Sequence, residues 1–385
     1  MSLSEEIRML QDLVERFVHE QIFPLESKIL EREQRGQQGL IEPLELKALH
    51  DKCKEVGLWG LDVPEHLGGA NLGVLEKMVV GEELGRTVAP FVFPPDSPNL
   101  HMMLATANDD QRKRYLEPYA RGETISAIAI SEPGAGSDPA GMTTKAIYKD
   151  GRWVLNGRKI WVSRMPQADF TIAMAVTDPE KGSRGGITAF LVDKDAVGMR
   201  IGQEFPMLGG HRTYEVIFEN CELPEAQVLG KIGDGFGPMQ LRLTVRRLEM
   251  GATCVGIARR SLDMMLAHVK DRITFGEKLA DRQAIQWWIA DAATKIHATR
   301  LMVHDAARKV DAGDDVRTEA SMIKVFATEM ATEIVDHAMQ SFGAMGIAKE
   351  MPLQLFAQQV RAARIYEGPT EVHRWVIARR LLKGS

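Results

Sequence analysis

The chain has 385 residues, of which 44% are hydrophobic and 26% are charged, so it is too long for one ordinary domain and too apolar for a disordered chain. Its 48 Lys and Arg residues against 53 Asp and Glu residues give a formal charge of -5, which argues against a general nucleic-acid binder. Its three cysteines are widely scattered and lack CxxC spacing, so the sequence indicates neither a disulfide framework nor a zinc site.

The N-terminal residues are acidic and continue directly into an amphipathic pattern, without the basic and apolar segments of a signal or transit peptide. No apolar run reaches the ~18 residues that a membrane span needs. We therefore expect a cytoplasmic protein with no membrane span and no nucleic-acid partner.

The first third of the chain has helical periodicity interrupted by turns. Ser4 precedes two glutamates and a series of apolar residues three and four apart, which is the pattern of a capped amphipathic helix. Further helices are predicted over 44–56, 75–84 and 109–116, and Gly- and Pro-rich segments separate them. The sequence therefore predicts an N-terminal helical domain over residues 1–120.

The periodicity changes at Thr124. Short runs of β-forming residues follow, over 125–130, 153–155, 159–163, 170–177, 187–192 and 214–220. Asp150-Gly151, Asn156-Gly157 and Gly185-Gly186 are compatible with hairpin turns. Because no helix-length segment intervenes, these strands should pair antiparallel, in a middle β-domain over residues 121–230.

Long helical patterns return from Phe236 onward. One face stays apolar for several turns over 285–296 and again over 323–334, as in the helices of a bundle, and Ala312 to Asp315 form a turn between them. The sequence predicts a C-terminal helical bundle over residues 231–385. The fold class is therefore α+β, mostly α, in the order helical, β, helical.

A glycine-rich loop is the densest candidate for chemistry. The segment Ser131 to Asp138 follows a predicted strand and carries two hydroxyls, two carboxylates and two glycines, so its backbone could approach a flat ring or a phosphate closely. A tight turn explains the same residues equally well. The segment is neither a Walker loop nor a dinucleotide fingerprint, because it has no Gly-Lys end and no helical pattern follows it.

Three other segments carry candidate residues. Arg272, in Arg-Ile-Thr-Phe-Gly between two helices, could hold a pyrophosphate, although an Arg beside a helix-ending Gly is common. Gln340 to Gly346 is glycine-rich at the end of an apolar helix, where a C-cap is the simpler interpretation. Glu367, in Tyr-Glu-Gly-Pro, is a candidate base, although most such glutamates are solvated. No His-Glu-x-x-His or Gly-x-Ser-x-Gly pattern occurs, so neither a metal site nor a hydrolase nucleophile is predicted.

In this order and at these separations, the four segments strongly resemble the acyl-CoA dehydrogenase family of flavoproteins, over essentially the whole chain. The resemblance implies an N-terminal helical domain, a middle antiparallel β-domain, a C-terminal four-helix bundle and the cofactor FAD. The FAD-binding residues that it implies are Ile130, Ser131, Ser137, Trp161, Ser163, Arg272, Phe275, Gln283, Gln340 and Gly343. Family members hold FAD with residues of two subunits, which implies a homodimer or, most often, a homotetramer.

The resemblance also implies the reaction, in which an acyl-CoA is dehydrogenated to the trans-2-enoyl-CoA. Glu367 falls on the family's catalytic base, which takes the α-proton while the β-hydrogen leaves as hydride to flavin N5. The Glu367 backbone N–H and a flavin ribityl hydroxyl would bind the thioester carbonyl. The substrate contacts that the resemblance implies are Ser137, Arg247, Tyr366 and Gly368. The electrons would pass to an electron-transfer flavoprotein.

The sequence departs from the family at several positions. Some members carry the base one residue before the Arg that matches Arg247, but here that position is Arg246, and Glu249 is out of register. Pro369 stands where the family usually has Thr, and the loop over 208–213 is shortened, so contacts made there by other members are not carried over.

Two alternative functions stay open. One is an oxidase-type reaction of the same fold with O₂, or a related reaction on a carrier-protein thioester. The other is a catalytically silent helical scaffold. A scaffold has no physical need of Ser131, Arg272 and Glu367 together, which argues against it.

Overall fold

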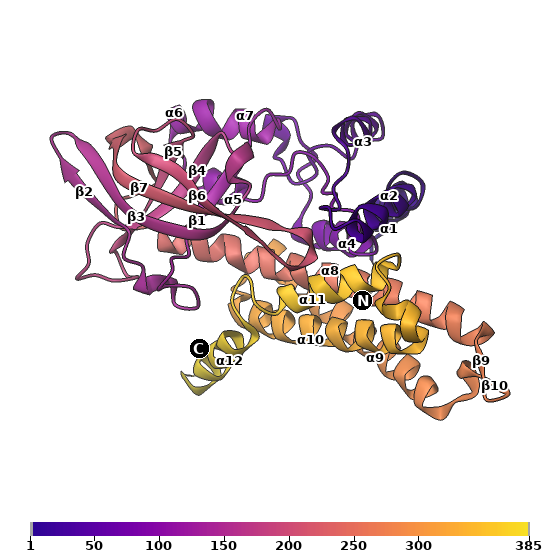
Figure 1. Ribbon diagram of the computed structural model, residues 1–385. Helices are drawn as coiled ribbons and strands as arrows, with labels where there is room; N and C mark the ends of the chain where they lie inside the picture. The colour runs from indigo at the N-terminus through magenta and orange to yellow at the C-terminus, as the bar shows by residue number, and fades with distance from the viewer. Residues whose placement is uncertain (1–2, 384–385) are drawn as a thin grey trace. The chain divides into compact units, whose positions relative to one another are not determined.

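The computed structural model describes residues 3–383, which form two compact units. Among these residues, the first unit comprises 3–56, 72–92 and 244–383, and the second comprises 57–71 and 93–243. Helix α8 (Phe236–Asp271) begins in the second unit and continues into the first. The predicted order of helical, β and helical segments is confirmed (Figure 1).

The first unit is almost entirely helical. Besides its part of α8, it contains α1 (Glu5–Phe17), α2 (Glu26–Gln34), α3 (Pro43–Glu55), α4 (Val74–Leu84), α9 (Gln283–Asp311), α10 (Arg317–Phe342), α11 (Pro352–Ala363) and α12 (Thr370–Lys383), with a small hairpin of β9 (Ile273–Thr274) and β10 (Glu277–Lys278). Helix α10 packs against α9, α11 and α12, as expected of a bundle. The predicted cap of the first helix is confirmed, because the Ser4 Oγ accepts a hydrogen bond from the Ile7 N–H at 3.3 Å.

The second unit places short helices beside an eight-stranded sheet. It contains α5 (Leu100–Thr106), α6 (Asp109–Gln111), α7 (Glu117–Ala120), β1 (Ser126–Ala129), β2 (Lys145–Lys149), β3 (Arg152–Ser163), β4 (Phe170–Val176), β5 (Ile187–Asp193), β6 (Met199–Pro206), β7 (Arg212–Pro224) and β8 (Val228–Leu229). The helix predicted over 109–116 begins at a capping box of Asn108 and Gln111 and continues through a π-helical turn, Arg112–Leu116, into α7.

The sheet has the order β6-β7-β3-β2-β4-β5-β8, with β1 added beside β4. Most neighbours are antiparallel, as predicted, but two pairs are parallel: β1 with β4, in a register that aligns Ser126 with Phe170, and β2 with β4 at Lys145 and Val176. The β2–β3 hairpin lies in the chain between β1 and β4, and such a long connection allows the chain to return to β1 in the same direction. Adjacent turn dipeptides cannot reveal this pairing, since they report only on consecutive strands.

One predicted hairpin turn is wrong. Asn156-Gly157 lies inside β3, which runs unbroken past both residues, whereas Asp150-Gly151 does join β2 to β3. A Cβ on Gly157 would lie 2.6 Å from the Cα of Thr144, so the glycine is needed for close approach between backbones rather than for a turn. The strands β2, β6 and β8 were not predicted.

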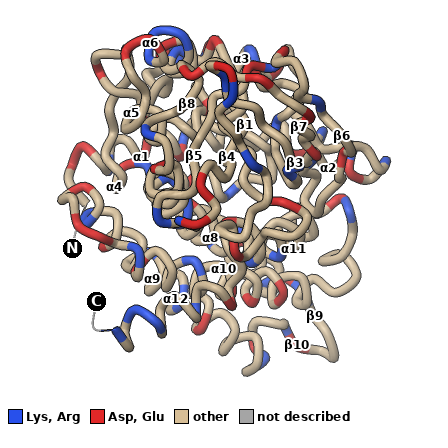
Figure 2. The backbone as a smooth tube through the Cα atoms, turned by 90° about the vertical axis from the view of Figure 1, so that its left-hand side faces the viewer, with Lys and Arg blue, Asp and Glu red and all other residues tan. Residues whose placement is uncertain are grey.

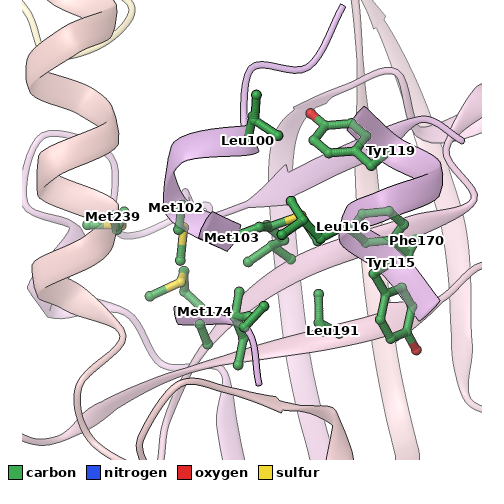
Figure 3. Close-up of a cluster of buried hydrophobic side chains, with 14 of the residues drawn as sticks. Leu100, Met102, Met103, Tyr115, Leu116, Tyr119, Phe170, Met174, Leu191 and Met239 are labelled. Carbon is green, nitrogen blue, oxygen red and sulfur yellow. The ribbon is translucent and has the colours of Figure 1, made fainter. Parts of the chain in front are cut away.

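The core of the second unit lies on both faces of the central strands. Along β4, Phe170, Ile172 and Met174 pack into one buried cluster, and Ala173 and Ala175 pack into another on the opposite face. Figure 3 shows the first cluster, in which the rings of Tyr115 and Tyr119 meet that of Phe170 edge-on. Because β4 is buried on both faces, it is a rigid support for β1, the paired strand that leads into the glycine-rich loop.

Charged residues of both signs are interspersed along the backbone in Figure 2, in line with the small net charge. Over residues 3–383, every helix is too short or too polar to cross a membrane.

Candidate active site

The glycine-rich loop forms a tight turn after β1. The Glu132 N–H donates to the Ala135 carbonyl at 3.0 Å, and the Ala135 N–H donates back to the Glu132 carbonyl at 3.1 Å. No other atom lies within 4 Å of a Cβ built on Gly134 or Gly136, so the outer side of the turn is open. The loop therefore satisfies the turn interpretation and also leaves room for a ligand to approach its backbone.

A buried ion pair that the sequence analysis missed supports this loop. The Lys159 Nζ lies 2.8 Å from Glu132 Oε1 and also donates to the Ile130 carbonyl at 3.0 Å. The Glu132 carboxylate further accepts hydrogen bonds from the N–H groups of Thr143 and Thr144 at 2.6 and 2.9 Å. Burial alone would raise the pKa of Glu132, but Lys159 and these hydrogen bonds lower it to about 2. The ion pair thus fixes the main chain of Ile130 and its neighbours.

Trp161 lies at a bulge in β3. The register with β7 shifts by one residue between Lys159 and Val162, and Trp161 has a positive φ of 59°. Its indole is 48% exposed and lies 4.7 Å, between ring centroids, from Phe205. Because the Ile160 N–H donates to the Ser131 carbonyl at 2.9 Å, the bulge and the glycine-rich loop are tied together. The structure therefore brings Ile130, Ser131 and the segment Trp161–Ser163 to one place, and it leaves Ser137 and Ser163 exposed.

The second group of predicted cofactor residues lies around the end of α8. Arg272 lines an open depression of about 590 Å³ together with Phe342, whose ring stacks on His268 at 4.1 Å. Gln340 and Gly343 flank Phe342 along the chain and are exposed. An open depression with a guanidinium and stacked rings fits a pyrophosphate attached to a flat base.

Phe275 and Gln283 are also exposed. Phe275 lies at the tip of the β9–β10 hairpin, has a positive φ of 51°, and its side chain is 100% exposed. Gln283 is the first residue of α9. The described residues leave both side chains open to solvent, as a contact with another molecule would require.

Glu367 lies in the turn between α11 and α12, and its main chain is held from two sides. It has a positive φ of 57°, and its carbonyl accepts hydrogen bonds from the Arg247 Nε at 3.1 Å and the His373 Nε2 at 3.2 Å. Desolvation outweighs the nearby Glu367 carboxylate and lowers the pKa of Arg247 below its usual value. Tyr366 is exposed and Gly368 half-buried beside it.

The alternative base, Glu249, is committed to cations. Its carboxylate lies 2.7 Å from Arg246 and 3.4 Å from Lys77. Burial raises the pKa of Glu249, but Lys77 and Arg246 outweigh it and lower the pKa to about 2. Such a carboxylate is a weak proton acceptor at neutral pH. Glu249 is therefore not a competing candidate, and Glu367 stays the predicted base.

No group of three or more His, Cys, Asp or Glu side chains that could hold a metal ion occurs within residues 3–383. The donors near the candidate residues are hydroxyls, amides and guanidinium groups, which suit an anionic organic ligand better than a metal.

The buried His373 leads to a pH prediction. Burial lowers the pKa of His373 from 6.5 to about 4, and the cations Arg247 and Lys324 act in the same direction. On acidification the unfolded chain gains a proton near pH 6.5 that the folded chain does not bind until about pH 4, so the folded state loses up to about 3 kcal/mol across this window. His373→Gln should remove this part of the loss. Urea unfolding of both chains at about pH 7 and about pH 4.5 measures it, and parallel changes in the two chains would contradict it.

Comparisons with known proteins match this chain over nearly its whole length. Models of the acyl-CoA dehydrogenase N-terminal, middle and C-terminal domains match residues 4–123, 127–221 and 233–382. The (R)-benzylsuccinyl-CoA dehydrogenase of Thauera aromatica is 41% identical over 99% of this chain and 96% of its own. The caffeyl-CoA reductase-Etf complex subunit CarC of Acetobacterium woodii is 34% identical over 100% of both chains. The solved FAD complex of PigA is 26% identical over 100% of both chains, with a TM-score of 0.87.

The three matched domains appear in the order of the fold, and the relatives match over at least 96% of their own lengths. The chain therefore belongs to the acyl-CoA dehydrogenase family of oxidoreductases.

Proposed function

We propose that this protein catalyses the α,β-dehydrogenation of an acyl-CoA thioester to the trans-2-enoyl-CoA, with Glu367 as the base. The observation that carries the proposal is the turn at Glu367, whose main-chain carbonyl accepts hydrogen bonds from both Arg247 and His373. An α-proton of a thioester is a weak acid, so its removal needs a carboxylate held in one orientation. The N–H of Glu367 binds the thioester carbonyl and stabilises the charge that develops there. Ser137, Arg247, Tyr366 and Gly368 contact the substrate.

FAD is the proposed cofactor, and when bound it supplies the acceptor for the hydrogen that leaves the β-carbon with its electron pair. The open outer side of the glycine-rich loop, the exposed indole of Trp161 and the depression beside Arg272 fit such a ligand. We assign the flavin ring to Ile130, Ser131, Trp161 and Ser163, and the pyrophosphate and adenosine to Ser137, Arg272, Phe275, Gln283, Gln340 and Gly343. The exposure of Phe275 and Gln283 supports binding by a neighbouring subunit, and hence a homodimer or homotetramer.

We further propose an electron-transfer flavoprotein as the electron acceptor. The support is the name of the 34% identical CarC, which is a subunit of a reductase-Etf complex. The cytoplasm is the proposed location. For the substrate, (R)-benzylsuccinyl-CoA is the first thioester to test, because the 41% identical relative is named for it.

Anaerobic titration of the purified protein tests the function. We expect a yellow protein whose visible flavin bands bleach with at least one acyl-CoA from a panel of benzylsuccinyl, short, branched, aromatic and long thioesters. Bleached protein should recover its colour slowly in air and rapidly with an electron-transfer flavoprotein. Rapid recovery in air alone would instead support the oxidase, and a colourless protein that cannot take up FAD would support the scaffold.

A further inference from the structure

The main chain at Glu367 needs support. A positive φ is unfavourable for a residue with a side chain, and Glu367 has a φ of 57°. Its carbonyl oxygen has two hydrogen-bond donors, Arg247 on α8 and His373 on α12. A single hydrogen bond to the carbonyl would still allow the peptide plane to rotate about that hydrogen bond. Two donors from different helices fix its orientation, and with it the direction in which the carboxylate leaves the main chain.

The hydrogen-bond partners also fix the tautomer of His373. The ring is 2% exposed and burial lowers its pKa to about 4, so it is neutral at working pH and carries one N–H. The Nε2 faces the Glu367 carbonyl, which can only accept, so the hydrogen is on Nε2. The Nδ1 must then accept, and its partner at 3.1 Å is the Ser321 hydroxyl on α10. This hydroxyl has one hydrogen and also lies 3.0 Å from the Arg317 carbonyl, so the Nε2–H tautomer of the ring requires the hydrogen to turn toward Nδ1.

Gly368 allows the imidazole to come this close. A Cβ at position 368 would lie 2.8 Å from the His373 Nε2, and the backbone there has a φ of 96°, so a side chain would displace the ring or strain the turn. The glycine after the base is thus explained by the histidine five residues further along the chain.

From these contacts the structure assigns His373 and Ser321 as positioning residues for the base, an inference that rests on the proposed function. The Ser321 hydroxyl donates to the His373 Nδ1, and the His373 Nε2–H donates to the Glu367 carbonyl. Three helices of the bundle, α8, α10 and α12, therefore converge through side chains on one peptide group. The role of His373 is to hold the base in register while the α-proton is transferred, and it does not itself take a proton.

Two amide replacements of His373 separate this role from simple packing. Gln can place its NH₂ where Nε2 lies and so keep the bond to the Glu367 carbonyl, whereas Asn is too short to do so. We expect His373→Asn to lower kcat for anaerobic flavin reduction roughly tenfold with KM and FAD content unchanged, and His373→Gln to stay within about threefold of the parent. Ser321→Ala leaves Nδ1 without its donor and should lower kcat roughly threefold.

A second measurement isolates proton removal from oxidation. A thioester with sulfur in place of the β-carbon can lose its α-proton to the base, but no hydrogen can leave from the β-position. Its rate of α-proton exchange with deuterated solvent should fall in His373→Asn by the same factor as kcat, and should stay near the parent rate in His373→Gln.

The outcomes distinguish the inference from the function beneath it. If the parent exchanges the α-proton and Glu367→Gln does not, but His373→Asn exchanges at the parent rate, the positioning role is wrong and the base stands. Equal losses in the Gln and Asn variants, or a loss in KM and FAD content together with kcat, would show a merely structural histidine. If His373→Asn does not fold, Ser321→Ala decides, and an unchanged kcat there overturns the inference. A parent protein that exchanges no α-proton at all would instead contradict the proposed function.

Discussion

Glu367→Gln should give a protein that is still yellow but no longer bleaches with acyl-CoA. The substitution keeps the size of the side chain and removes its ability to take a proton. Arg247 and His373 bind the main-chain carbonyl, so the turn itself should survive. General-base catalysis by a positioned side chain is worth between about a hundredfold and ten-thousandfold, and we expect a loss of roughly a thousandfold in the rate of anaerobic flavin reduction. Stopped-flow absorbance with a bleaching thioester measures it.

Glu371→Gln is the matched control. Glu371 lies four positions further along, in the first turn of α12, and is exposed. Its replacement changes the charge of the same region by the same amount, yet it should reduce flavin at close to the parent rate. If Glu367→Gln bleaches as fast as the parent, the base lies elsewhere. Glu249 is a poor substitute, because Lys77 and Arg246 hold its carboxylate.

The elements that the sequence predicted correctly are those with local signals. The Ser4 cap and the turn at Gly313 each depend on residues within one turn of the chain. Asn156-Gly157 has the composition of a hairpin turn, but its conformation is set by β2 and β7 on either side of it. Whether such a dipeptide forms a turn or continues a strand depends on strands distant in sequence, which the dipeptide alone does not reveal.

The candidate site likewise contains some residues that local motifs predict and others that depend on distant parts of the chain. Motifs located the glycine-rich loop, Arg272 and Glu367, while the residues that support them come from far along the chain. Lys159 pairs with a carboxylate 27 positions earlier, and His373 bonds a serine 52 positions earlier. The sequence did contain a signal for Lys159. It lies an even number of residues from the buried Trp153 and Leu155, so its side chain is on the same face of the strand as theirs. A lysine at an inward position of a strand requires a buried partner.

Lys159→Met should be the most destabilising single change in the second unit that we can name. It leaves the carboxylate of Glu132 buried without its cation, and breaking a buried pair in this way costs about 3–5 kcal/mol. For a unit of this size the loss corresponds to a fall in Tm of roughly 10 °C. The affinity for FAD should fall as well, because the Ile130 carbonyl loses the donor that fixes the glycine-rich loop.

Arg158→Met and the double variant Lys159→Met/Glu132→Gln complete this test. Arg158 is adjacent in sequence but its side chain is 58% exposed, and its partner Glu215 keeps a second donor in the Gln203 N–H, so the loss of Arg158 should cost about 1 kcal/mol. In the double variant no charge stays buried alone, so most of the lost stability should return. Thermal unfolding together with the FAD content of each protein reports both effects. A Lys159→Met protein as stable as Arg158→Met would mean that the carboxylate finds water or takes a proton at little cost, and the ion pair would then not be what holds the loop.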